Sequence, residues 1–81
     1  MRIEVRLFAQ ARERVGSAQA RLELPEGSRV ADALTLLERA HPGLVELRPH
    51  LAIAVDGTLA RDADALADGC ELALLPPVSG G

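Results

Sequence analysis

The residues best suited to chemistry stand at the end of the sequence, which closes with Pro76-Pro77-Val78-Ser79-Gly80-Gly81. Two glycines form the thinnest backbone that a chain can have, and they accept almost any φ and ψ. Such an end can enter a narrow channel in another protein and present its α-carboxylate there. That carboxylate is ionised at neutral pH and is a poor electrophile, so it must be activated before any group transfer. The simpler interpretation is a frayed chain end, which is common.

Two prolines separate this arm from the strand that is expected before it. Residues 70–75 alternate between inward-facing leucines and other side chains, which predicts a strand. Proline has no backbone N–H and a fixed φ, so the sheet cannot continue through Pro76-Pro77. The sequence therefore predicts a folded domain over residues 1–75 and a flexible tail over residues 76–81. Such a tail reaches at most about 20 Å from the last strand.

Composition narrows the class of protein. The chain has 81 residues, a net charge of −3 and a pI near 5.2, which argue against binding to nucleic acid or to an anionic membrane. No apolar run approaches the ~20 residues of a membrane span, and the charged start does not resemble a signal peptide. The single cysteine, Cys70, excludes an internal disulfide. We expect one cytoplasmic domain that contacts neither nucleic acid nor membrane.

The remaining patterns predict the order of the elements. Alternation of apolar and polar residues predicts strands over residues 2–8, 20–24, 51–55, 58–59 and 70–75. Helical spacing after the N-cap candidate Ser28 connects Val30, Ala33, Leu34, Leu37 and Ala40, and the helix ends at residues 41–43. Residues 9–15 are too short for a helix prediction, and residues 44–50 are expected to form an irregular connection or a short helical turn. This order matches an α+β fold of the β-grasp (ubiquitin-like) type, in which a mixed sheet of about five strands wraps one main helix.

Two large apolar residues fall outside the alternating pattern. Phe8 and Leu75 each end a strand, and each is expected on the sheet face that points away from the helix. In a β-grasp the first and last strands are parallel neighbours, so the two side chains should lie together beside the root of the tail. Leu59 extends this group if it shares their face. We interpret Phe8, Leu59 and Leu75 as an interface for a partner protein.

The other reactive side chains show no pattern typical of catalysis. His41 and His50 have no metal-ligand spacing with Cys70 or with each other, so no metal site is expected. Cys70 has two interpretations, a sulfur relay or a small, partly buried residue. It precedes Leu75 by five residues, which places its thiol ~16 Å from the root of the tail. The second interpretation is therefore favoured.

The two ends of the chain resemble one known family. Arg6-Leu7-Phe8-Ala9-Gln10-Ala11-Arg12-Glu13, the Asp68-Gly69 turn and Pro76-Pro77-Val78-Ser79-Gly80-Gly81 resemble the small subunit of molybdopterin synthase, the MoaD family. The resemblance covers essentially the whole length. Members of that family often carry an acidic residue where Cys70 stands, a departure that leaves the tail untouched.

The resemblance implies a sulfur carrier. Gly81 would be adenylated by an ATP-dependent adenylyltransferase and converted to a thiocarboxylate with sulfur from a sulfurtransferase. The tail, Pro76 to Gly80, would insert into the large catalytic subunit, where the sulfur passes to cyclic pyranopterin monophosphate and builds the molybdopterin dithiolene. The family implies a heterotetramer with that subunit. It implies no bound cofactor and no catalytic side chain in the small subunit, because ATP belongs to the activating enzyme and sulfur is carried on Gly81.

Three other functions remain open. A carrier for thiamine synthesis or tRNA thiolation would use the same tail with a different partner. A protein modifier would join its terminus to lysines of other proteins. All nine basic residues here are arginine, so a modifier of this sequence could not build chains through its own side chains. A plain interaction domain with an idle tail would tolerate the loss of Gly81.

Overall fold

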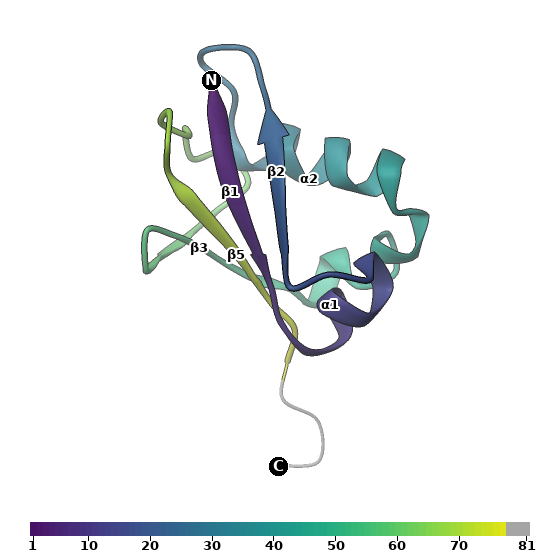
Figure 1. The fold of residues 1–81 in the computed structure, drawn as a ribbon. Helices are drawn as coiled ribbons and strands as arrows, with labels where there is room; N and C mark the ends of the chain where they lie inside the picture. The colour runs from purple at the N-terminus through teal and green to yellow at the C-terminus, as the bar shows by residue number, and fades with distance from the viewer. Residues whose placement is uncertain (78–81) are drawn as a thin grey trace.

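Five strands form one mixed sheet in the computed structural model, which describes residues 1–77 (Figure 1). In chain order the strands are β1 (Arg2–Leu7), β2 (Gln19–Glu23), β3 (Ala52–Val55), β4 (Thr58–Ala60) and β5 (Glu71–Leu75). Their order across the sheet is β2-β1-β5-β3-β4. The central strands β1 and β5 run parallel, and the other neighbours are antiparallel. The predicted β-grasp fold is therefore confirmed, although most strand ends differ from the prediction by one residue.

Two α-helices and two short 3₁₀ helices connect the strands. They are α1 (Ala9–Val15), α2 (Val30–Ala40), η1 (Pro42–Leu44) and η2 (Arg48–His50). Residues 9–15, which carried no prediction, form α1, and Gly16 ends it in the left-handed conformation with φ +87°. Residues 44–50 were expected to form an irregular connection or a short helical turn, and η2 lies within them, whereas η1 begins earlier and overlaps them only at Leu44. The main helix α2 lies across one face of the sheet, as Figure 1 shows.

The start of α2 differs from the prediction. Ser28 is not the N-cap, because its hydroxyl donates to the carbonyl of Pro25 at 2.7 Å and closes the turn before the helix. Arg29 is the N-cap residue, and its backbone N–H donates to the Asp32 carboxylate at 2.8 Å. The carboxylate thus satisfies a backbone donor and lies in the first turn, where the helix dipole favours a negative charge. Ala40 was predicted to face the core but is exposed.

The hydrophobic core lies between α2 and the inner face of the sheet. Its buried members are Ile3, Val5, Leu7, Ala11, Leu24, Val30, Ala33, Leu34, Leu37, Leu44, Leu47, Ile53, Leu66, Cys70, Leu72 and Leu74. Nearly all are aliphatic, as the scarcity of aromatic residues requires. Removal of this apolar surface from water is the main force that stabilises the fold. No helix among the described residues is long and apolar enough to cross a membrane.

Candidate functional site

The tail begins at the middle of the sheet. Leu74 of β5 pairs with Leu7 of β1, and both strands end within one residue of this pair. Leu75 closes β5 and is half-buried, Pro76 is also half-buried, and Pro77 is exposed. In Figure 1 the end of β5 lies beside α1. The remaining residues of the predicted tail, Val78, Ser79, Gly80 and Gly81, lie outside the described residues.

The outer face of the sheet carries a row of paired residues close to this end, and three of the four are apolar. Arg6 pairs with Ala73, Ala73 with Ala54, and Ala54 with Leu59, so one row crosses four strands. Paired residues share a face of a sheet, so Leu59 lies on the outer face with Ala73. Its side chain is 76% exposed. The facing of Leu59, which the sequence pattern left undecided, is thus established.

Phe8 lies one residue beyond β1 instead of ending it. Its backbone is extended, and the next residue, Ala9, has a φ of +47°. A positive φ is unfavourable for a residue with a Cβ, so this conformation of Ala9 costs conformational free energy. The Phe8 ring is 41% exposed, and the Arg6 guanidinium carbon lies 6.0 Å from its centroid. That distance is within the range of a cation–π contact and links the ring to the outer face.

These residues form one surface, which we call the outer apolar patch. Its members are Phe8, Ala52, Leu59, Ala73 and Leu75, which are exposed or half-buried, and Ala54, which shares their face but is only 7% exposed. The alanines lie between the larger side chains, since Ala52 pairs with Leu75 and Ala54 pairs with Leu59. The patch spans the distance from β1 to β4, about 14 Å at the usual strand spacing. Sequence reasoning missed its alanines, because an alanine on the outer face of a strand gives no distinct apolar signal.

Cys70 and the histidines lie away from the tail root. Cys70 is 4% exposed and belongs to the core, so it is more deeply buried than expected. It immediately precedes β5, at the opposite end of that strand from Leu75. His41 is half-buried and His50 is exposed. Within residues 1–77 no three His, Cys, Asp or Glu side chains form a group that could hold a metal ion.

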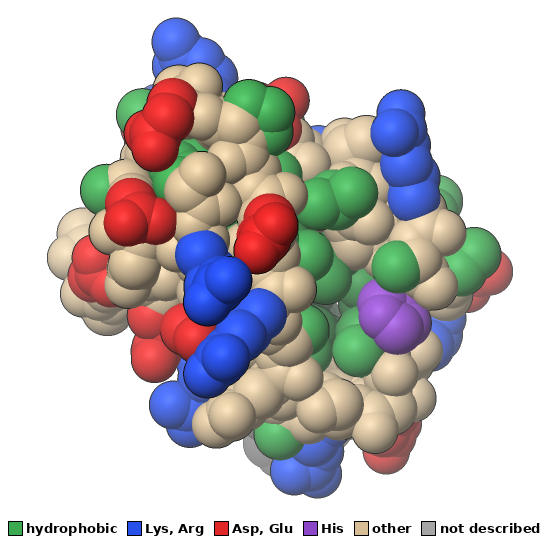
Figure 2. All heavy atoms as spheres, turned by 45° about the horizontal axis from the view of Figure 1, so that its top comes forward, with side chains coloured by type: hydrophobic (Ala, Val, Ile, Leu, Met, Phe, Trp, Pro, Cys, Tyr) green, Lys and Arg blue, Asp and Glu red, His purple; other side chains and the backbone are tan. Residues whose placement is uncertain are grey.

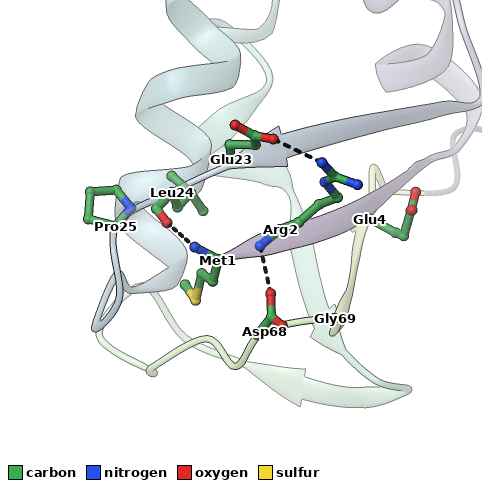
Figure 3. Close-up of a pocket in the computed structure, with 8 residues that line it drawn as sticks. All are labelled: Met1, Arg2, Glu4, Glu23, Leu24, Pro25, Asp68 and Gly69. Atoms are coloured by element: carbon green, nitrogen blue, oxygen red, sulfur yellow. Dashed lines mark hydrogen bonds and ion pairs between the residues drawn. The ribbon is translucent and has the colours of Figure 1, made fainter.

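A hollow of about 810 Å³ also lies at the far end of the sheet (Figure 3). Its polar groups contact one another. The Arg2 guanidinium donates to the Glu23 carboxylate at 3.1 Å, and the Arg2 backbone N–H donates to the Asp68 carboxylate at 2.8 Å. The Met1 ammonium donates to the carbonyl of Leu24 at 2.6 Å. We assign this hollow a structural role, because these hydrogen bonds and ion pairs connect the start of β1 to the segments beside it.

Known relatives match the chain over nearly its full length. The ThiS family model covers residues 5–81. The molybdopterin synthase sulfur carrier subunit of Chlamydomonas reinhardtii is 37% identical over 83 residues, with all of both chains covered. Small archaeal modifier protein 1 of Haloferax volcanii is 40% identical over 87 residues, which cover 98% of this chain and 100% of the relative.

Solved structures agree with these matches. The crystal structure of SAMP1 from Haloferax volcanii has a TM-score of 0.90 at 39% identity, with all of both chains covered. A protein–protein complex of subunits 1 and 2 of molybdopterin-converting factor from Helicobacter pylori has a TM-score of 0.71 at 28% identity, again with both chains fully covered. The chain therefore belongs to the ThiS family, whose members similar to it include molybdopterin synthase sulfur carrier subunits.

Proposed function

We propose that this chain is the sulfur carrier subunit of molybdopterin synthase and acts in molybdenum cofactor biosynthesis. In this proposal Gly81 carries a thiocarboxylate whose sulfur goes to cyclic pyranopterin monophosphate and forms the molybdopterin dithiolene. One observation supports it most strongly: a chain that ends in Gly-Gly leaves the sheet next to the outer apolar patch. A docking surface beside the root of a reactive chain end suits a carrier, because the carrier must bind a partner while its terminus enters that same partner.

The chemistry requires little from the body of the protein. Adenylation of the Gly81 carboxylate by ATP releases pyrophosphate and supplies AMP as a leaving group. A sulfur nucleophile, supplied through a sulfurtransferase, then displaces AMP. Both steps belong to partner enzymes, so the carrier needs no bound cofactor and no catalytic side chain. The acid–base groups for the transfer to the pterin belong to the large subunit.

The outer apolar patch would dock the large catalytic subunit. Phe8, Leu59 and Leu75 would be the anchors, because large apolar groups buried at the centre of an interface carry most of its binding energy. Residues 76–80 would then thread the tail into that subunit. The similarity to a solved complex of two molybdopterin-converting-factor subunits supports such a partner. We expect a heterotetramer in the cytoplasm.

A second candidate function is protein modification. The similarity to small archaeal modifier proteins 1 and 3 of Haloferax volcanii, at 40% and 34% identity, favours it. A modifier would use the same adenylated Gly81 but transfer the whole chain to an amine instead of transferring sulfur. Carriers for thiamine synthesis or tRNA thiolation are a further alternative, since they share the tail chemistry.

Intact mass spectrometry tests the proposal directly. The full chain is incubated with ATP, a sulfur source and the activating enzyme, and the expected product has one carboxylate oxygen replaced by sulfur. That product is then mixed with the large subunit and cyclic pyranopterin monophosphate, and dithiolene formation is measured. A chain that ends at Gly80 is the matched control. Sulfur loading without pterin sulfuration would favour another thiolation pathway, and adducts with lysines of many proteins would favour the modifier.

A further inference from the structure

We propose that two copies of this chain associate through the free edge of β2, so that two sheets join into one. This surface lies on the opposite edge of the sheet from β4, and the inference is independent of the proposed function. It depends on three features of β2: the direction of its backbone groups, the charges of its outward side chains and the apolar surface beside it.

The backbone of β2 has unused hydrogen-bonding groups. Strand β2 stands at the edge of the sheet and pairs only with β1 within residues 1–77. The Leu24 N–H donates to the Met1 carbonyl, and the Leu7 N–H donates to the Ala18 carbonyl. The direction of the backbone N–H and C=O groups alternates along a strand. The even-numbered residues of β2 therefore direct these groups toward β1, and the odd-numbered residues direct them away from the sheet.

The outward groups of β2 are available at two positions. At Gln19 the Ser17 hydroxyl contacts both backbone groups, at 2.7 Å to the carbonyl and 3.2 Å to the N–H. Arg21 and Glu23 direct their N–H and C=O groups away from β1, and no strand among the described residues pairs with β2 on that side. An exposed edge of this kind is a template for another strand. No proline or bulge interrupts residues 19–23.

The side-chain charges of β2 favour a second copy as the partner. A symmetric antiparallel pair of β2 strands must match odd residues with odd residues, because a one-residue slip turns every side chain to the other face. If Arg21 faces its own copy, or Glu23 faces its own copy, like charges meet. In a third register, midway between these two, Arg21 lies opposite Glu23 of the second copy at both ends of the seam. Of the three registers, this one alone brings opposite charges together.

This register also extends an existing charge pattern. On the outer face, Arg21 contacts Glu4 at 2.8 Å and Glu23 contacts Arg2 at 3.1 Å. Pairing of two β2 strands would create rows that read Glu4, Arg21, Glu23 and Arg2 across the seam, with signs alternating throughout. Figure 2 shows acidic and basic side chains gathered side by side on one face of the molecule. Cross-strand pairs of opposite charge stabilise a sheet.

The inner side of the seam would be apolar. The two-fold axis would pass between Leu22 and its copy, and Ala20 would lie opposite Leu24 of the second copy. Leu22 and Ala20 are half-buried, and so is Leu36 of α2, which lines a hollow together with Glu23 and Leu24 of the region around β2. Pairing would remove this apolar area from water, and the strands that carry most of the outer apolar patch, β5, β3 and β4, lie away from the seam.

A seam of this length is below the usual size of a stable interface, ~1,200–2,000 Å². We therefore expect a weak dimer that dissociates at micromolar concentration and forms toward millimolar concentration. Sedimentation equilibrium of the full chain over that range tests this expectation. A wild-type chain that remains monomeric at millimolar concentration would overturn the proposal.

Charge reversal tests the register. Arg21→Glu and Glu23→Arg each place like charges opposite one another at both ends of the seam, so each variant alone should associate at least about tenfold more weakly. An equimolar mixture of the two variants pairs Glu with Arg again, so association should return. Arg6→Glu is the matched control, because Arg6 pairs with Glu71 on the same face but lies on a central strand. Association that survives both reversals, or that mixing does not restore, contradicts the register.

A cross-link gives an independent measurement. In a Cys70→Ala background, Leu22→Cys should form an intermolecular disulfide with oxidised glutathione, because residue 22 meets its own copy at the two-fold axis. Directly opposed residues of a non-hydrogen-bonded pair have Cα atoms ~4.5 Å apart, which a disulfide can span. Ala20→Cys should not cross-link, since residue 20 faces Leu24 of the second copy. Equal cross-linking of both variants would show a different contact and overturn the proposal.

Discussion

Leu59 has a large apolar side chain that the fold does not need. It is 76% exposed on the short edge strand β4, so Leu59→Asp should leave the melting temperature almost unchanged. Binding to the large subunit should weaken by ~2 kcal/mol, the typical loss for an interface anchor. Calorimetric titration measures the affinity, and thermal unfolding measures the stability.

Val45 provides a matched control for this prediction. It is 53% exposed and lies between η1 and η2, in the connection that leads from α2 to β3, so it is not part of the outer apolar patch. Val45→Asp should change neither affinity nor stability by more than ~0.5 kcal/mol. If Val45→Asp weakens binding as much as Leu59→Asp does, the interface lies elsewhere. Leu75 is a less suitable probe, because it is half-buried and Leu75→Asp should also destabilise the fold.

Cys70 should be dispensable for sulfur transfer. Its side chain is buried in the core beside the start of β5, at the opposite end of that strand from Leu75, so the thiol is shielded from a reacting terminus. Cys70→Ala should retain transfer and lose ~1 kcal/mol of stability, since only one small group is removed from the core. A thiol reagent should label native Cys70 slowly and the denatured chain quickly. Loss of transfer in a folded Cys70→Ala variant would make the thiol a participant.

At the scale of elements, the β3–β4 hairpin depends on one aspartate. Asp56 has a φ of +49° and Gly57 a φ of +82°, which gives the turn that Asp-Gly favours between two strands. The Asp56 carboxylate also accepts the Glu71 N–H at 2.9 Å, and the Asp56 N–H donates to the Glu71 carbonyl at 2.9 Å. One residue thus shapes the turn and joins the hairpin to β5.

Replacing this aspartate should separate the two roles. Asp56→Ala loses the side-chain acceptor and tolerates a positive φ poorly, so unfolding free energy should fall by ~1–2 kcal/mol. Asp56→Asn keeps an oxygen acceptor and tolerates the left-handed region, so its loss should stay below ~0.5 kcal/mol. Chemical denaturation of both variants measures the difference. Equal losses would show that the negative charge, and not the geometry, is what the turn requires.

The elements also show which parts of the fold the sequence could predict. The alternating strands and the Asp56-Gly57 turn were predicted, because their signals are local and periodic. Helix α1 was not predicted, since seven residues show too few turns to reveal a period. The N-cap of α2 was misplaced because Ser28 bonds backward to Pro25, a choice that depends on the preceding turn. A serine at a helix start can bond either to the helix or to the preceding turn, and the residue pattern alone does not show which bond forms.

The candidate site was predictable to a similar degree. Phe8 and Leu75 stood out because each breaks an alternating pattern, and the parallel pairing of β1 with β5 brings their strand ends together. Ala54 and Ala73 could not be found, because their membership of the outer apolar patch depends on register between strands far apart in the sequence. The positive φ of Ala9 also left no signal, since nothing in the residue type favours it.

On the scale of the whole molecule, we expect the described body to bind the partner and the Gly-Gly end to carry the sulfur. Strand pairing ends at Leu75, and the outer apolar patch lies entirely within the body. Deletion of Gly81 should therefore leave the melting temperature and most of the affinity for the large subunit unchanged. Thermal unfolding and calorimetric titration of the truncated chain check these two expectations.

The same deletion should abolish sulfur transfer. The new terminus would stop about 3.5 Å short of the reacting position, the length of one extended residue. A misplacement of ~1 Å can already reduce a rate about a hundredfold. Addition of one residue after Gly81 should also fail, because it converts the reactive carboxylate into a peptide bond. Thiocarboxylate formation and pterin sulfuration are measured separately on each variant. Normal sulfuration by a chain that ends at Gly80 would refute the carrier hypothesis and favour an interaction domain. The reason is that the rate of a reaction at the terminus must depend on where the terminus lies.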